Sequence, residues 1–75
     1  MYALIETIGK AATIDLFDDL KDLEKEMILR YNTKLRESSV IDWKRTGFWL
    51  DELYGRVRDE KNIVEWRAGE IKGKE

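Results

Sequence analysis

The clearest pattern of hydrophobic and polar positions covers residues 16–36 and is helical. Apolar side chains recur there every three or four positions, at Leu16, Leu20, Leu23, Met27, Tyr31 and Leu35. At 100° per residue these positions share one arc, which is typical of a helix that buries one face. Asp15 is a suitable N-cap residue, and Asp18 and Asp19 would lie in the first turn, where the helix dipole favours negative charge. We therefore predict a long amphipathic helix.

The first fourteen residues predict a β-hairpin. Residues 2–8 are rich in strand-forming side chains, and residues 11–14 follow a two-residue Gly9-Lys10 loop of the type II′ kind. Such a turn fixes a register in which Ile5 lies opposite Ile14. The alternative is a short helix over residues 2–8, with Gly9 as its C-terminal cap.

The opening residues resemble the first hairpin of a bacterial large-subunit ribosomal protein family. The likeness is carried by Met1-Tyr2-Ala3, Ile5-Glu6-Thr7 and Gly9-Lys10. It covers ten of the 75 residues and then stops. The resemblance implies an N-terminal hairpin and extends to nothing else in the chain.

The second half of the chain allows two interpretations. Apolar positions from Trp43 to Val57 fit one arc of a tryptophan-rich helix over about 40–59, after a break at Ser38-Ser39. Gly47 and Gly55 would each cost such a helix about 1 kcal/mol. Alternatively, residues 53–58 form a strand that pairs with residues 63–66. Residues 63–67 predict a short final strand, and residues 69–75 a frayed tail.

Together these elements predict an α+β fold in one domain over residues 1–68, with the order ββααβ. A small all-α bundle is the alternative. Seventy-five residues are too few for a second domain. A core of this size is marginally stable alone, so we expect self-association or folding against a partner to contribute.

The amino-acid composition limits the catalytic and metal-binding chemistry that the protein can perform. The chain has no Cys and no His, which excludes disulfides, thiolate or imidazole metal sites and Ser-His or Cys-His nucleophile pairs. Neighbouring carboxylates on a helix point about 100° apart and do not converge on one reacting atom. We expect no enzymatic activity, no cofactor and no metal. Without a long apolar run or a signal peptide, we expect a cytoplasmic protein, in the host cytoplasm if the chain is viral.

An acidic stripe on the first helix suggests a docking surface. Asp18, Asp22 and Glu26 follow one another at intervals of four residues, and Leu29 falls among them on the helical wheel. Like charges at this spacing destabilise a helix slightly, so the stripe does not serve helix stability. The stripe is either a solvated face or a contact for a partner protein that is basic or that itself binds nucleic acid.

A second candidate contact is the pair Ile41 and Phe48, which project from the polar side of the predicted second helix. They either pack under the hairpin or form an exposed apolar patch ringed by charges, as protein contacts do. The resulting expectation is a non-enzymatic protein-binding module. Its strongest form is an inhibitor or modulator of a larger protein, of the kind carried by phages and mobile elements.

Two other functions are compatible with the sequence. The aromatic helix could pack against its symmetry mate in a homodimer or a larger homo-oligomeric assembly. Alternatively, the basic residues Arg36, Lys44 and Arg45, near the predicted turn between the helices, could bind nucleic acid weakly. The net charge of −2 disfavours nucleic acid as a partner.

Overall fold

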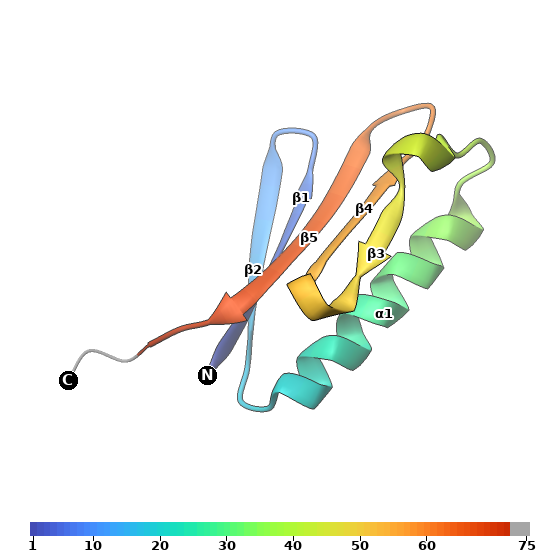
Figure 1. Ribbon diagram of the computed structural model, residues 1–75. Coiled ribbons are helices and arrows are strands. Elements are labelled where there is room, and N and C mark those ends of the chain that lie inside the picture. The colour runs from blue at the N-terminus through green and yellow to red at the C-terminus, as the bar shows by residue number, and fades with distance from the viewer. Residues whose placement is uncertain (73–75) are drawn as a thin grey trace.

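A computed structural model describes residues 1–72 and confirms the α+β class. Over these residues it contains one α-helix and a five-stranded antiparallel sheet of order β2-β1-β5-β4-β3, with the helix against one face (Figure 1). The strands are β1 (Tyr2–Ile8), β2 (Ala11–Phe17), β3 (Gly47–Trp49), β4 (Tyr54–Arg58) and β5 (Ile63–Glu70). The helical segments are α1 (Leu20–Glu37) and the short 3-10 helices η1 (Trp43–Arg45) and η2 (Leu50–Glu52).

The N-terminal hairpin has the predicted turn and register. Gly9 adopts a φ of 59° and is followed by a residue with negative φ, as the type II′ turn requires. Ile5 lies opposite Ile14, and Ile8 lies opposite Ala11. The alternative helix over residues 2–8 is therefore excluded.

The long helix begins later than predicted. β2 continues to Phe17, and the N-cap is Asp19, whose carboxylate accepts a 2.8 Å hydrogen bond from the backbone N–H of Lys21. Asp15, the predicted cap, lies instead in β2 opposite Leu4. Leu16 belongs to β2 as well and is 58% exposed. From Leu20 onward the prediction is confirmed, with an apolar face that buries Leu23 and Met27 against the sheet.

The predicted second helix is wrong. Residues 40–59 contain η1, β3, η2 and β4, and β4 pairs with β5 as in the hairpin alternative, with Val57 opposite Val64. Gly55 explains much of this, because an added Cβ would lie 2.9 Å from the Phe48 ring and 3.4 Å from the Trp66 ring. Its bare backbone lets two aromatic rings pack directly on β4. The all-α alternative is excluded by the same sheet.

The C-terminal strand is longer than predicted. β5 extends to Glu70, and Gly69 pairs with Ala3 of β1. The backbone N–H of Ile71 then donates a 2.9 Å hydrogen bond to the carbonyl of Met1. The ordered sheet therefore includes the first two residues of the expected tail, whose positions 73–75 lie outside the described residues.

The core lies between the sheet and α1. Its fully or almost fully buried side chains come from every part of the chain: Leu4, Leu23, Met27, Val57, Val64 and Trp66. Phe48 and Tyr31 extend this core, with ring centroids 5.2 Å apart. Strands β1, β4 and β5 and the helix therefore act as one packing unit.

Replacing Gly55 with alanine tests the packing on β4. We expect a loss of about 1–2 kcal/mol in the free energy of unfolding, because the new methyl group would overpack the Phe48 ring. Gly69→Ala is the matched control, since nothing lies within 4 Å of an added Cβ there. Urea denaturation compares the variants, and equal stability for both would contradict this account of β4.

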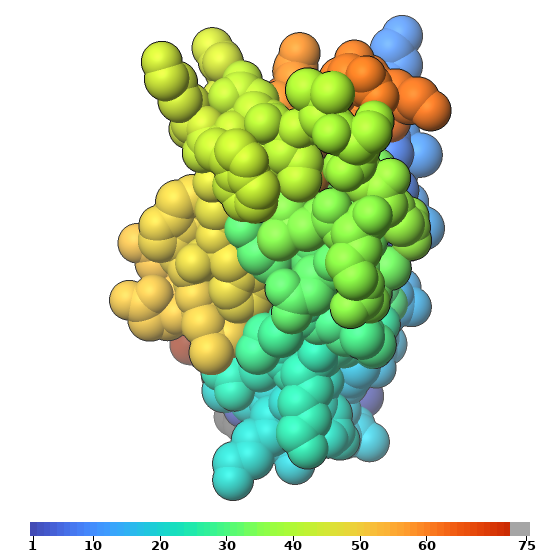
Figure 2. Space-filling model, turned by 90° about the vertical axis from the view of Figure 1, so that its right-hand side faces the viewer, coloured from blue at the N-terminus to red at the C-terminus, as the bar shows by residue number. Residues whose placement is uncertain are grey.

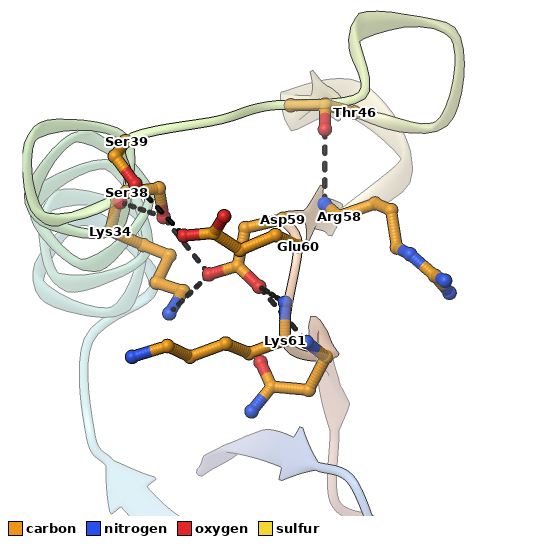
Figure 3. A network of polar contacts seen from close by, with 9 residues as sticks. Lys34, Ser38, Ser39, Thr46, Arg58, Asp59, Glu60 and Lys61 are labelled. Carbon is orange, nitrogen blue, oxygen red and sulfur yellow. Dashed lines mark hydrogen bonds and ion pairs between the residues drawn. The ribbon is translucent and has the colours of Figure 1, made fainter.

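Asp59 joins the end of α1 to the turn between β4 and β5 (Figure 3). Its carboxylate, only 8% exposed, accepts hydrogen bonds from the backbone N–H groups of Asn62 (2.9 Å) and Lys61 (2.8 Å). The Lys34 ammonium lies 3.0 Å away, and the Ser38 hydroxyl donates at 3.2 Å. These donors, the Asn62 N–H foremost and Lys34 next, hold the pKa of Asp59 well below its usual range.

This lowered pKa predicts a pH dependence of stability. A depressed carboxyl pKa stabilises the fold above the unfolded-state value of about 3.9, and the contribution is lost as pH falls through the folded-state pKa. We therefore expect the midpoint of urea unfolding to shift to lower urea concentration as the pH is lowered from about 5 to about 2. Asp59→Asn should lower the midpoint at pH 7 and flatten this dependence, whereas Asp18→Asn, in an exposed turn, should preserve it. If Asp59→Asn kept the pH dependence of the wild type, the Asp59 carboxyl would not be the cause of the acid-dependent loss of stability.

Candidate interaction surface

One face of the sheet has no helix over it within residues 1–72 (Figure 1). Side chains alternate between the two faces of a strand, and Leu4, Val64 and Trp66 are buried toward α1. The intervening residues of β1 and β5 therefore point to the opposite side, which we call the open face. Strand register aligns one row across it: Ile14, Ile5, Arg67, Tyr54 and Trp49.

The half of the open face formed by β1 and β2 is apolar. Its residues, which we call the apolar patch, are Ala3, Ile5, Ala12, Ile14 and Leu16. Ile14 is 63% exposed and Leu16 58% exposed. Cross-strand pairing sets Ile5 beside Ile14 and Ala3 beside Leu16, so the patch is contiguous. A contiguous apolar patch of this kind typically marks a contact with another macromolecule.

The other half of the open face is aromatic and cationic. The Trp49 and Tyr54 rings stack with centroids 5.7 Å apart, and the Arg67 guanidinium lies 5.3 Å from the Tyr54 ring centroid. The Tyr54 hydroxyl donates a hydrogen bond to Glu65. Partial burial is the main cause that raises the pKa of Tyr54, and this hydrogen bond raises it further. The same hydrogen bond, helped by Arg67, lowers the pKa of Glu65. The Tyr54 side chain is therefore held between Trp49 of β3 and the Glu65 and Arg67 side chains of β5.

Arginine dominates the charge of the open face. The strand positions on this face carry Arg56, Arg58 and Arg67 against the single carboxylate Glu65, in a protein whose net charge is −2. Arg67 lies 3.3 Å from Glu65, and the Arg56 Nε donates to the Arg45 carbonyl at 2.7 Å. The open face is thus cationic beside its apolar patch, and this combination favours an apolar surface bordered by carboxylates.

The helix side carries a groove of about 320 Å³ between α1 and strands β1 and β5. Figure 2 shows this side of the molecule, with α1 (teal to green) rising from the bottom between the β3 segment and the N-terminal hairpin, and the segment after α1, which includes η1, above it. Arg30 lines the groove, 2.7 Å from Glu26, 2.8 Å from Asp15 and 3.7 Å from Glu6. Glu6 also accepts a 2.6 Å hydrogen bond from the Trp66 indole.

The charge of Arg30 is balanced within the chain. Burial alone would lower the pKa of its guanidinium, but hydrogen bonds to Asp15 and Glu26 outweigh this and raise it. Three carboxylates therefore surround a permanently charged guanidinium. The groove consequently offers an incoming anion no unpaired cation at this position, and we interpret the cluster as structural.

The predicted acidic stripe is only partly available for docking. Asp18 lies in the exposed turn before α1, outside the helix in which it was expected, and Asp22 is exposed in the first turn. Glu26 is half-buried and held by Arg30. Leu29 is 55% exposed and borders the groove. Among residues 1–72, Asp18 and Asp22 therefore have no salt bridge, whereas Glu26 is removed from the set.

The Ile41 and Phe48 pair does not project from a helix. Phe48 lies in β3, is half-buried and packs on Tyr31, and half-buried Ile41 forms an isolated bridge with Asp59. Of the two alternatives for this pair, packing against the rest of the domain is the one observed. The other alternative, an exposed apolar contact formed by Ile41 and Phe48, is wrong because the segment is extended and directs Phe48 toward α1.

The candidate nucleic-acid residues are spread over two elements. Arg36 is exposed in the last turn of α1, whereas Lys44 and Arg45 are exposed in η1. Arg45 lies 2.7 Å from Asp42 and lowers the pKa of that carboxyl. Lys44 keeps its side chain at the surface, and its backbone N–H bonds Asp42. Sequence reasoning missed the cationic group of the open face, which consists of Arg67 on β5 and of Arg56 and Arg58 on β4; its signal is the two-residue spacing of Arg56 and Arg58.

Comparisons with protein-family models, curated proteins and solved structures gave no match. Over residues 1–72, no helix is both long and apolar enough to cross a bilayer. The functional argument therefore depends on the surfaces described above.

Proposed function

We propose that the protein is a non-enzymatic binding module that docks on a larger protein and inhibits or modulates it. Its open face is the main contact, and the single observation that supports this most is the exposed, contiguous apolar patch beside three arginines. Burial of exposed isoleucine and leucine side chains would supply affinity. The arginines would supply orientation and selectivity.

The chemistry of the open face defines the partner. A suitable surface has an apolar ridge to cover Ile14 and Leu16 and carboxylates to meet Arg58 and Arg67. The exposed carboxylates Asp18 and Asp22 offer a second, weaker contact for basic groups at the margin of the same partner. The proposal includes a cytoplasmic site of action, which rests on the cysteine-free composition.

Charge reversal on the open face tests this function. With a partner captured by the wild-type protein and then purified, we expect Arg58→Glu to weaken binding at least tenfold, which is about 1.4 kcal/mol. Arg36→Glu is the matched control, because Arg36 is also exposed but lies on α1. Ile5→Lys should also weaken binding, whereas Val40→Lys, at a 58% exposed position outside the sheet, should not.

Binding that is unchanged in both Arg58→Glu and Ile5→Lys would contradict the use of the open face. Circular dichroism of each variant separates a lost contact from a lost fold. Stronger loss in Asp22→Lys than in Arg58→Glu would instead assign the main contact to the acidic side of α1.

A second candidate function is binding of single-stranded nucleic acid, favoured by the Trp49–Tyr54 stack next to the arginines. Tyr54 is covered by Trp49 on one side and approached by Arg67, so it has little free ring for a base. We therefore expect no quenching of tryptophan fluorescence by a mixed-sequence oligonucleotide in 50 mM salt. Quenching that disappears in Arg58→Glu would replace the protein partner by nucleic acid.

A further inference from the structure

The two edges of the sheet differ in how they are protected against pairing with another strand. β3 has three residues and is flanked by η1 and η2. β2 has seven residues, A-A-T-I-D-L-F, with none of the lysines, prolines or bulges that usually protect an edge. Its one charged residue, Asp15, is held 2.8 Å from Arg30. β2 is therefore a long edge strand that is open to pairing.

One hydrogen bond fixes which backbone groups of β2 are free. The N–H of Ile71 donates to the carbonyl of Met1, so the odd-numbered residues of β1 direct their backbone groups to β5. Because these directions alternate along an antiparallel strand, the even-numbered residues of β1 bond the odd-numbered residues of β2. The N–H and C=O groups of Ala12, Ile14 and Leu16 consequently point outward, away from β1.

We propose that β2 pairs antiparallel with β2 of a second copy of this chain, about a twofold axis that sets Ile14 opposite Ile14. In this register Ala12 lies opposite Leu16 of the second copy. All three outward-pointing residues of each chain then form hydrogen-bonded pairs. On the open face the side chains that meet are all apolar, and on the other face Asp15 lies opposite Thr13 of the second copy, so the two Asp15 carboxylates do not face each other.

Registers of the β2–β2 pair that are centred on the residue before or after Ile14 are less favourable. Centring the pair on Thr13 would set Leu16 opposite Lys10, which lies in the hairpin turn, so that Leu16 would lose a strand partner. Centring it on Asp15 would set two carboxylates directly opposite each other, which is destabilising. It would also place Ala12 opposite a residue beyond the end of β2. Ile14 is thus the favoured centre.

Pairing in this register makes one sheet of ten strands from two five-stranded sheets, with both helices on the same side. The two apolar patches join across the axis, because Ile14 and Leu16 lie on the open face of each copy. A single strand pair is at the small end of protein interfaces, so we expect a weak dimer that forms in the micromolar range or above. Such a dimer presents a doubled open face.

Charge complementation at position 14 tests both the pairing and its register. Sedimentation equilibrium of the wild-type chain should show a reversible dimer as the concentration rises to several hundred micromolar. Ile14→Lys and Ile14→Glu should each weaken the dimer at least tenfold, because each sets like charges opposite each other. An equimolar mixture of the two variants should regain dimers. Ile14 is exposed, so both variants should remain folded, as circular dichroism will show.

Matched controls use Val40→Lys and Val40→Glu, which change the charge at another exposed apolar position, outside the sheet. They should dimerise like the wild type. A wild-type chain that stays monomeric, or variants at position 14 that dimerise equally well alone and mixed, would overturn the proposal. Arg58→Glu and Ile5→Lys do not alter the β2 edge, so the partner-binding function can fail or succeed independently of this dimer.

Discussion

Trp66→Ala should lower the free energy of unfolding by about 3–5 kcal/mol, the range found when a buried aromatic side chain is truncated. Trp66 is 2% exposed and belongs to the buried core, with its ring nearly perpendicular to that of Tyr31 at a centroid distance of 6.3 Å. A domain of this size has little more stability than that to lose. We therefore expect the variant to be largely unfolded at 37 °C.

Urea denaturation followed by far-ultraviolet circular dichroism measures this loss. Trp43→Ala is the matched control, since Trp43 lies in η1 and is 63% exposed; its effect should stay within about 0.5 kcal/mol. Trp66→Phe keeps a ring but loses the indole hydrogen bond to Glu6, and should cost about 1–2 kcal/mol. Equal stabilities for Trp43→Ala and Trp66→Ala would place the core elsewhere.

The elements that sequence reasoning predicted well are those whose signals are local. The period of three to four residues through Leu23 and Met27 indicates α1 because the helix contributes its own buried stripe. Likewise, the Gly9-Lys10 turn fixes the register of β1 and β2 because a two-residue loop allows few geometries. Neither inference needs information from distant parts of the chain.

The second half of the chain was harder because its aromatic residues fit a helical arc and a sheet equally well. Gly55 carried the decisive signal, since a glycine against two rings has a reason to exist in β4 and none in an amphipathic helix. That reason becomes visible only when Trp66 of β5 is placed beside it. The contact joins residues that are distant in sequence, and secondary-structure propensities do not include such contacts.

The predicted start of α1 was wrong for a related reason. Leu16 fits the helical arc and also continues the alternation of Ala12 and Ile14, and the two periods cannot be separated over so few residues. The choice depends on Asp15, which pairs with Arg30 fifteen residues later rather than capping a helix. Assigning Leu16 to the helix face concealed the apolar patch, which exists only because α1 covers the opposite side of the sheet.

Arg30→Met should lower the free energy of unfolding by about 1.5–3 kcal/mol, as expected when charge-assisted hydrogen bonds are removed and their acceptors remain. Three carboxylates, Glu6, Asp15 and Glu26, would then lie close together without the cation that joins β1, β2 and α1. The loss should shrink in 1 M salt, where screening weakens both the repulsion in the variant and the attraction in the wild type.

Arg36→Met is the matched control for this change, because Arg36 is exposed and its side chain contacts only Thr33, at 3.3 Å, among the hydrogen bonds formed over residues 1–72. It should leave the unfolding midpoint within the error of the measurement. The comparison also separates two roles for the groove. If Arg30 contributed nothing to the stability of the fold and served only to bind an anionic ligand, Arg30→Met would be as stable as Arg36→Met. A clear loss in Arg30→Met alone assigns the guanidinium to the fold and leaves the open face and the β2 edge as the surfaces for binding.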